Sequence, residues 1–155
     1  MRVISGGQTG VDRAALDVAL ELGLPCGGWC PAGRRAEDGP IDARYPLAQT
    51  DTIDYAERTR RNVAEADATL VLCHGGLGGG TLLTVEAACA LDKPCLVIDL
   101  RRPWQPLEVQ RWLQACAVTS VNLAGPRETG APGIHALASD FLRAVLAPLV
   151  TDKTF

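Results

Sequence analysis

Two glycine-rich segments of the sequence carry residue types that bind phosphate. The first runs from Ser5 to Arg13 and reads Ser-Gly-Gly-Gln-Thr-Gly-Val-Asp-Arg. Glycine lets a backbone approach a ligand closely and tolerates positive φ angles. A helix beginning at Val11 would add free N–H groups and the positive end of its dipole. This combination predicts a phosphate site, and the alternative is a plain strand-to-helix turn that binds nothing.

The second segment covers residues 74–81 and reads His-Gly-Gly-Leu-Gly-Gly-Gly-Thr. Ordering so many glycines costs conformational entropy, so close approach of a ligand is the expected compensation. The spacing resembles a nucleoside-triphosphate loop, but the lysine before the Ser/Thr is missing. The first segment likewise lacks the glycine spacing of the dinucleotide-binding motif. Both segments are therefore predicted to be phosphate loops of a non-standard kind.

Backbone amides in both segments are the expected phosphate donors, because hydrogen bonds to charged groups contribute about 1.5–3 kcal/mol each. Arg13 either adds positive charge to the site or pairs with a surface acid. Asp12 and Asp17 either contact a heterocycle or sugar or stabilise the helix start without a ligand. The predicted binding residues are Gly6, Gly7, Gln8, Thr9, Gly10, Asp12, Arg13, Gly75, Gly76, Gly78, Gly79, Gly80, Thr81 and Thr84.

Other polar and aromatic residues are secondary candidates. Arg58 and Arg61 share one face of a predicted helix, where a charge run is usually solvated. Asn62 is placed to hydrogen-bond the loop backbone, and His74 either meets a ligand or has a structural role. Trp29 either stacks on a flat ring or packs against the protein.

Alternating strands and helices must position these residues. Strands are predicted over residues 2–4, 26–30, 68–73, 95–100 and 120–124. Helices are predicted over residues 11–22, 55–66, 81–91, 107–117 and 134–150. This alternation predicts an α/β fold, a Rossmann-like doubly wound, mainly parallel sheet flanked by helices on both faces. Ligands bind beyond the carboxyl ends of such strands, so both glycine segments are expected to line one crevice. His135 comes far along the chain, in the final predicted helix, and is not expected to take part.

The composition limits the fold and its partners. The 155 residues predict one Rossmann-like domain over residues 1–150 and a C-terminal tail over 151–155. The net charge of −3 and the lack of a basic tract argue against nucleic acid as a partner. No apolar run reaches the roughly 18 residues of a membrane span, and the N-terminus lacks a signal-peptide layout. A cytoplasmic protein with no membrane partner is therefore expected.

The six cysteines predict no metal site. Cys26 and Cys30 are separated by three residues, and no second Cys/His pair stands at zinc-site spacing. Cys73 ends a predicted core strand, and Cys89 and Cys116 lie in apolar helices, where a thiol packs as a small hydrophobe. We expect reduced, mostly buried thiols, with Cys73 the best candidate for a ligand role because it abuts the second glycine segment.

Several motifs, in the same order, resemble the molybdenum cofactor carrier family. They lie at residues 5–17, 45–47, 55–63, 66–70 and 79–84, whereas the C-terminal third matches in layout only. The resemblance implies a Rossmann-like fold related to the lysine-decarboxylase-like phosphoribohydrolase superfamily. It also implies a homo-oligomer that binds the molybdenum cofactor, whose organic part is molybdopterin.

Three functions follow from these observations. The leading hypothesis is a non-catalytic binding protein for a small phosphorylated cofactor or nucleotide, with the molybdenum cofactor as candidate. The related hydrolases cleave a nucleotide N-glycosidic bond with a glutamate three residues after the loop threonine. Thr84 stands there, and threonine is a poor substitute for that carboxylate. Glu86, the nearest acid, lies roughly 200° around the helix and is catalytic only under this alternative. A nucleotide-binding sensor is the third possibility.

Overall fold

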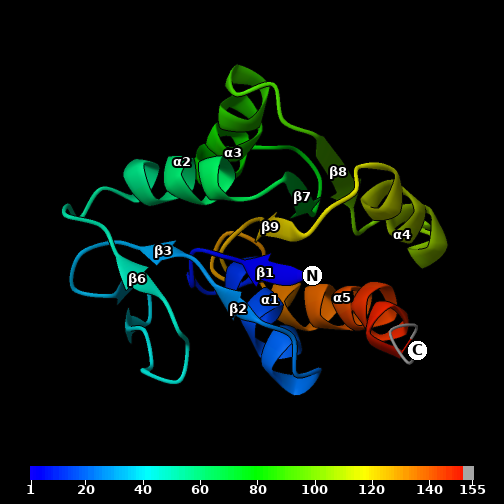
Figure 1. Ribbon diagram of the computed structural model, residues 1–155. Helices are drawn as coiled ribbons and strands as arrows, with labels where there is room; N and C mark the ends of the chain where they lie inside the picture. Colours follow the sequence, from blue (N-terminus) through cyan, green and yellow to red (C-terminus); the bar gives the residue numbers. More distant parts are fainter. Residues whose placement is uncertain (152–155) are drawn as a thin grey trace.

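The computed structural model describes residues 1–151 and has a central sheet of five strands (Figure 1). All neighbouring strands run parallel. The strands, in chain order, are β1 (Arg2–Ile4), β2 (Cys26–Gly27), β7 (Ala68–Cys73), β8 (Cys95–Asp99) and β9 (Ser120–Ala124). Their order across the sheet is β2-β1-β9-β7-β8, which places the last strand of the chain at the centre.

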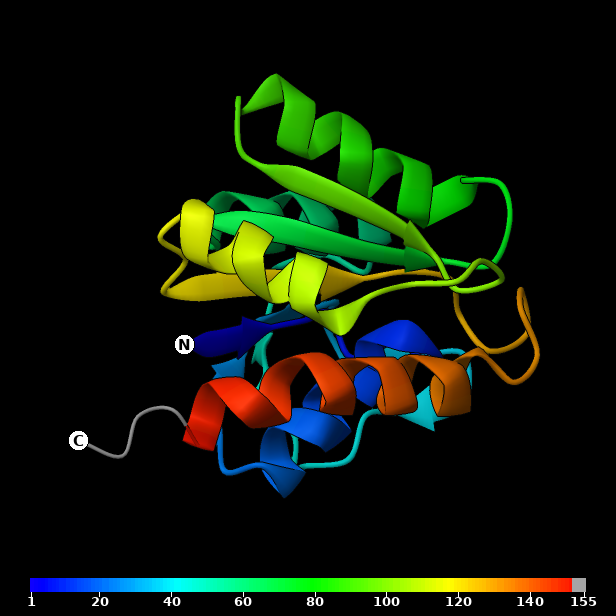
Figure 2. The ribbon, with the colours of Figure 1, turned by 90° about the vertical axis from the view of Figure 1, so that its right-hand side faces the viewer.

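Helices cover both faces of this sheet, which confirms the predicted α/β, Rossmann-like fold. They are α1 (Val11–Glu21), α2 (Tyr55–Glu65), α3 (Gly79–Ala90), α4 (Pro106–Ala115) and α5 (Ile134–Thr151). Figures 1 and 2 show α2 and α3 on one face and α1, α4 and α5 on the other. All six residues of β7 are buried, as expected for a parallel strand covered on both faces.

The main core lies between the sheet and the helices α1 and α5. Val11, Ala14 and Val18 of α1 follow helical spacing and are all buried there. Helix α5 is long and apolar enough to cross a membrane by length and composition alone. Its buried residues, among them Phe141 and Leu142, nevertheless belong to this core.

The predicted strand over residues 26–30 is divided into β2 and β3 (Trp29–Cys30). Gly28, between them, has a φ of +132°, and a Cβ there would lie 2.2 Å from the Ser5 carbonyl oxygen. The chain therefore leaves the central sheet at this glycine. Strand β3 then pairs in parallel with β6 (Ala48–Gln49), and β4 (Arg35–Ala36) pairs antiparallel with β5 (Gly39–Pro40).

The segment between β3 and α2 is held by one arginine. The guanidinium of Arg34 donates to the carbonyl oxygens of Ile41, Asp42, Leu47 and Tyr45 at distances of 2.8–3.1 Å. A second small core, separate from the main one, lies beneath this segment and contains Leu16, Cys30, Ile41, Tyr45 and Leu47. The segment is thus a packed layer over α1.

The expectation of mostly buried thiols is wrong. All six cysteines are free, but only Cys30 and Cys73 are buried. Cys89 is exposed because the buried residues of α3 are Thr81, Thr84 and Ala88, on another side of the helix. At the C-terminal end, Thr151 still belongs to α5, and the rest of the predicted tail lies outside the described residues.

Candidate functional site

Three loops meet at the carboxyl ends of the central strands. Because β9 lies between β1 and β7, the loop after β9 enters between the two predicted glycine segments. Figure 2 shows the loops after β7 and β9 at the same edge of the sheet. A cavity of about 410 Å³, called the main cavity below, lies among them. Its lining is Gln8, Asp12, Arg58, Thr59, Cys73, His74, Gly76, Gly78, Gly79, Gly80, Thr81, Thr84, Ala124, Gly125, Pro126, Arg127, Gly130 and Ala131.

The second glycine loop presents open backbone to the main cavity. Gly79 and Gly80 begin α3, and their amides find no acceptor among residues 1–151. A Cβ added at Gly76, Gly78, Gly79 or Gly80 would meet no atom within 4 Å. The first turn of α3 also contains no acidic residue. The cavity therefore receives free N–H groups and an uncompensated positive helix end.

The threonines of α3 line the same part of the main cavity. Thr81 and Thr84 are buried, and the Thr84 hydroxyl donates to the carbonyl oxygen of Gly80 at 2.9 Å. Glu86 is exposed and lies outside the lining. The position that needs a carboxylate for hydrolysis thus holds a hydroxyl bonded to its own helix.

The glycines of the first loop are enclosed by protein atoms. A Cβ at Gly6 would lie 1.7 Å from Nη1 of Arg58. Gly7 has a φ of +75°, and its Cβ would lie 2.5 Å from a leucine methyl group of the segment before α2. Gly10 has a φ of +79°, and its Cβ would lie 2.3 Å from the carbonyl oxygen of Pro126. These positions require glycine to let the protein pack against itself.

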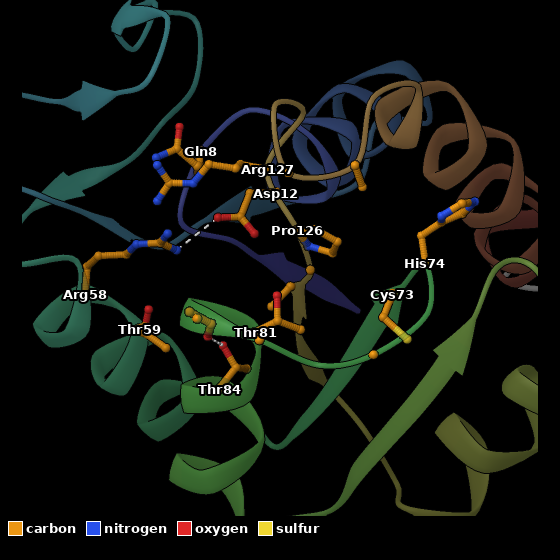
Figure 3. Close-up of a pocket in the computed structure, with 18 residues that line it drawn as sticks. Gln8, Asp12, Arg58, Thr59, Cys73, His74, Thr81, Thr84, Pro126 and Arg127 are labelled. Carbon is orange, nitrogen blue, oxygen red and sulfur yellow. Dashed lines mark hydrogen bonds and ion pairs between the residues drawn. The ribbon is translucent and has the colours of Figure 1, made fainter.

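A carboxylate of the protein binds inside the first loop. Asp12 is 3% exposed, and its Oδ2 accepts from Nη1 of Arg58 at 2.9 Å (Figure 3). The backbone N–H of Gln8 donates to the same carboxylate. Burial raises the pKa of Asp12, while the Arg58 guanidinium acts in the opposite direction. The first loop therefore already holds an anion, supplied by its own helix.

Two donors in the wall of the main cavity have no hydrogen-bond partner among the described residues. One is Nε2 of Gln8, whose residue is 4% exposed, and the other is the buried Nε of Arg58. Oε1 of Gln8 accepts from the backbone N–H groups of Thr9 at 3.0 Å and Glu37 at 2.8 Å. Because both partners are donors, the amide oxygen must face them, and the NH₂ group faces elsewhere.

The other polar residues of the first loop line a second hollow of about 610 Å³. There Arg13 donates to the Gly7 carbonyl oxygen at 3.1 Å and pairs with Asp38 at 3.0 Å. The Thr9 hydroxyl donates to Glu37. These groups satisfy one another, so this network needs no ligand.

His135 lines this second hollow, although it was not expected to take part in a site. Its Nε2 is 2.8 Å from Oδ2 of Asp17, whose Oδ1 accepts from the Tyr45 hydroxyl at 2.5 Å. This contact joins α5, α1 and the segment between β3 and α2. Its signal in the sequence was hidden, because the partner of His135 is more than a hundred residues away.

The predicted site residues thus divide into three groups. The main cavity collects Gln8, Asp12, Gly76, Gly78, Gly79, Gly80, Thr81 and Thr84. The second hollow contains Thr9, Gly10 and Arg13. Neither lining includes Gly6, Gly7 or Gly75.

The secondary candidates also separate. Arg58 and His74 line the main cavity, whereas Trp29 and Asn62 do not. Asn62 accepts from the backbone N–H of Trp29 at 2.7 Å and donates to its carbonyl oxygen at 3.0 Å. The Trp29 indole N–H donates to Glu65 at 2.8 Å. Trp29 and Asn62 therefore fix β3 against α2.

The loop after β9 was not predicted to be part of the site, yet it supplies Gly125, Pro126 and Arg127 to the main cavity. The Arg127 guanidinium lies 5.6 Å from the centre of the Tyr55 ring and 3.9 Å from Glu37. A signal was present, because Gly125 and Pro126 directly follow a strand as the other two glycine segments do.

Comparisons with known proteins agree with this geometry. Residues 3–146 match the circularly permutated YpsA SLOG family. A crystal structure of a candidate molybdenum carrier protein from Syntrophus aciditrophicus is similar, with 43% sequence identity and a TM-score of 0.90. The match covers 94% of each chain. None of the curated proteins compared matches. The chain therefore belongs to the circularly permutated YpsA SLOG family and resembles its molybdenum-carrier-like members.

Proposed function

We propose that this chain is a binding protein for a phosphorylated cofactor or nucleotide, with the molybdenum cofactor as the candidate cargo. The observation that carries the proposal is the open N-terminus of α3. Four glycines at which an added Cβ would meet no atom within 4 Å line the main cavity beside free amides: Gly76, Gly78, Gly79 and Gly80. Such a helix start is a ready anion site, and a phosphate fits it.

The residues of the main cavity suit the organic part of the molybdenum cofactor, which joins a phosphate to a flat pterin. The volume of about 410 Å³ lies within the usual range for small-ligand sites, roughly 300–1,000 Å³. The glycines of α3 would hold the phosphate. Gln8, Asp12 and Arg58, in the opposite wall, would offer donors and an acceptor to the ring (Figure 3). The similar Syntrophus protein, a candidate molybdenum carrier, is compatible with this cargo.

Binding without hydrolysis is the favoured activity. Within residues 1–151, Asp12 is the one carboxylate in the lining of the main cavity, and it is held by Arg58. Thr84 is bonded to the helix backbone, and Glu86 is exposed elsewhere. A hydrolase needs a carboxylate free to activate water or stabilise a cationic transition state.

The test is retention of molybdenum cofactor released from a molybdoenzyme. The purified protein is mixed with the cofactor and passed through a desalting column, and pterin fluorescence is read in the protein fraction after oxidation. We expect retention by the natural protein and by Gly23→Ala, whose position has no atom within 4 Å and lies outside the main cavity. We expect loss in Gly80→Ala. No retention by the natural protein, together with no binding of inorganic phosphate, would overturn the proposal.

A further inference from the structure

The two ends of the main cavity differ in charge. At the α3 end, free amides and the helix dipole are not offset by any acid in the first turn. At the other end, the Arg58 charge is paired with Asp12 at 2.9 Å, and Arg127 lies 3.9 Å from Glu37. One end therefore attracts an anion, whereas the other is close to neutral.

The neutral end still contains a donor that needs an acceptor. Nε2 of Gln8 is buried and has no partner among the described residues, and Gln8 is one of the residues that line the cavity. Its orientation is fixed, because Oε1 is held by two backbone N–H groups. Leaving such a donor unsatisfied is unfavourable, so a ligand acceptor placed there strengthens binding. The buried Nε of Arg58 adds a second donor in the same wall.

Asp12 determines what kind of acceptor can fit. A second phosphate or carboxylate at this end would meet a buried carboxylate that already uses the Arg58 charge. A neutral carbonyl oxygen meets no such repulsion. The Asp12 carboxylate now accepts from the Arg58 guanidinium and from the backbone N–H of Gln8. A carboxylate can accept more hydrogen bonds than these two, so Asp12 can also accept from a ligand N–H.

We propose that the ring end of the ligand carries a lactam edge, a carbonyl next to a ring N–H. The carbonyl accepts from Nε2 of Gln8, and the ring N–H donates to Asp12. This inference rests on the proposed function, because the phosphate at α3 sets which end of the ligand arrives there. In Figure 3, Gln8 and Asp12 lie across the cavity from Thr81 and Thr84. The geometry thus selects oxo-heterocycles over amino-heterocycles.

The test uses inosine 5′-monophosphate and adenosine 5′-monophosphate as probes in titration calorimetry. They share the ribose phosphate and the purine and differ in one edge, N1–H beside a 6-carbonyl against bare N1 beside a 6-amino group. We expect inosine monophosphate to bind about tenfold more tightly, since one orphaned donor is worth roughly that factor.

The variant Gln8→Glu removes the donor and keeps an acceptor for the two backbone N–H groups. Its carboxylate can still accept from the Thr9 and Glu37 amides, as Oε1 of Gln8 does. We expect the preference for inosine monophosphate to fall to parity or to reverse. Gln49→Glu is the matched control, because Oε1 of Gln49 also accepts a backbone N–H, that of Gly33 at 2.8 Å, outside both cavities.

Each outcome separates the two proposals. Equal affinity of the natural protein for both nucleotides would overturn the lactam inference and leave phosphate binding in place. The same holds if Gln8→Glu keeps the preference. If neither nucleotide nor inorganic phosphate binds, the proposed function fails and this inference fails with it. The comparison on the natural protein does not depend on the folding of any variant.

Discussion

The two predicted glycine loops have similar composition but use their glycines for different purposes. In the first loop, a side chain at Gly6 or Gly10 would collide with atoms of the protein itself. In the second loop, Gly78 and Gly80 face open space beside free amides. A glycine-rich turn therefore indicates close approach of something, but only the surroundings show whether that is a ligand or the protein.

The same contrast holds for charge. The first loop encloses the Asp12 carboxylate, so its anion is internal. The second loop begins a helix without an acid in its first turn. We infer that the first loop is a structural element that supports the cavity wall, and that the second loop receives the ligand.

Gly10→Ala should have the largest effect, because it tests whether the first loop is packed against the protein. A positive φ costs an alanine roughly 1–2 kcal/mol, and overlap with the Pro126 carbonyl oxygen adds a similar or larger amount. We expect the free energy of unfolding in urea to fall by about 4 kcal/mol. Gly23→Ala, also at positive φ but with no atom within 4 Å, should lose only about 1 kcal/mol. Equal losses would show that Gly10 is not packed as described.

Arg58→Met tests the internal anion of the first loop. Removing one partner of a buried ion pair costs about 3 kcal/mol, because Asp12 stays buried without a counter-charge. Its pKa, already raised by burial, rises further. When the pKa of an acid is higher in the folded state than in the unfolded state, ionisation of that acid destabilises the fold. The destabilisation is complete above the folded-state pKa and absent below the unfolded value of 3.8. The deficit measured in urea should therefore shrink as the pH is lowered towards 4.

Arg61→Met serves as the control for that variant. Arg61 lies on the same helix, with its guanidinium over the Trp29 ring and 3.4 Å from Glu57. An exposed pair of this kind contributes about 0–1 kcal/mol. A pH-independent loss in Arg58→Met, or an equal loss in both variants, would contradict the role given to Asp12.

Gly80→Ala tests whether the second loop receives the ligand. Alanine is favoured over glycine within a helix, so the free energy of unfolding should stay equal or rise by up to about 1 kcal/mol. The added methyl group enters the space beside the free amides, and we expect the affinity for inosine monophosphate to fall about tenfold, roughly 1.4 kcal/mol. Unchanged affinity in calorimetry would remove the second loop from the site.

Asp67→Asn probes the opposite end of the strands and should have the smallest effect. Hydrogen bonds from the Thr119 and Ser120 amides and the Thr119 hydroxyl, each 2.8 Å long, lower the pKa of Asp67 to about 2. A lowered pKa stabilises the fold above the unfolded value of 3.8, and this contribution is lost as the pH falls towards 2. Because Asp67 is exposed, we expect a loss of only about 1 kcal/mol near neutral pH. The loss of unfolding free energy in Asp67→Asn should therefore shrink as the pH is lowered, as in Arg58→Met. A loss that grows on acidification would contradict this assignment.

Much of the fold could be predicted from local sequence patterns. The strands over residues 68–73 and 120–124 have the predicted bounds. Residues 68–73 form the mainly apolar run that marks a central parallel strand. The order of the strands is not a local property. Nothing in the sequence near residues 120–124 shows that β9 pairs with both β1 and β7. The loop after β9 was missed for this reason.

The site could be predicted only where the role of a residue depends on residues next to it in the sequence. The glycines at the start of α3 and the lack of an acid in its first turn are local features of the sequence, whereas the open space around them is not. Arg58 was expected to be solvated, yet only 13% of its side chain is exposed and it pairs with Asp12, whose place on α1 is distant in sequence. Long-range pairs of this kind have no signal in a single sequence. The homo-oligomer, the cytoplasmic location and the division into one domain and a tail stay predictions.

The most direct measurement is a titration of the ¹⁵N-labelled protein with inorganic phosphate, followed through the backbone amide signals. The account predicts progressive shifts at Gly78, Gly79, Gly80 and Thr81, with the amides of Gly6 and Gly7 unmoved. Shifts confined to the first loop, or none in either loop, would contradict the claim that the N-terminus of α3 is the phosphate site.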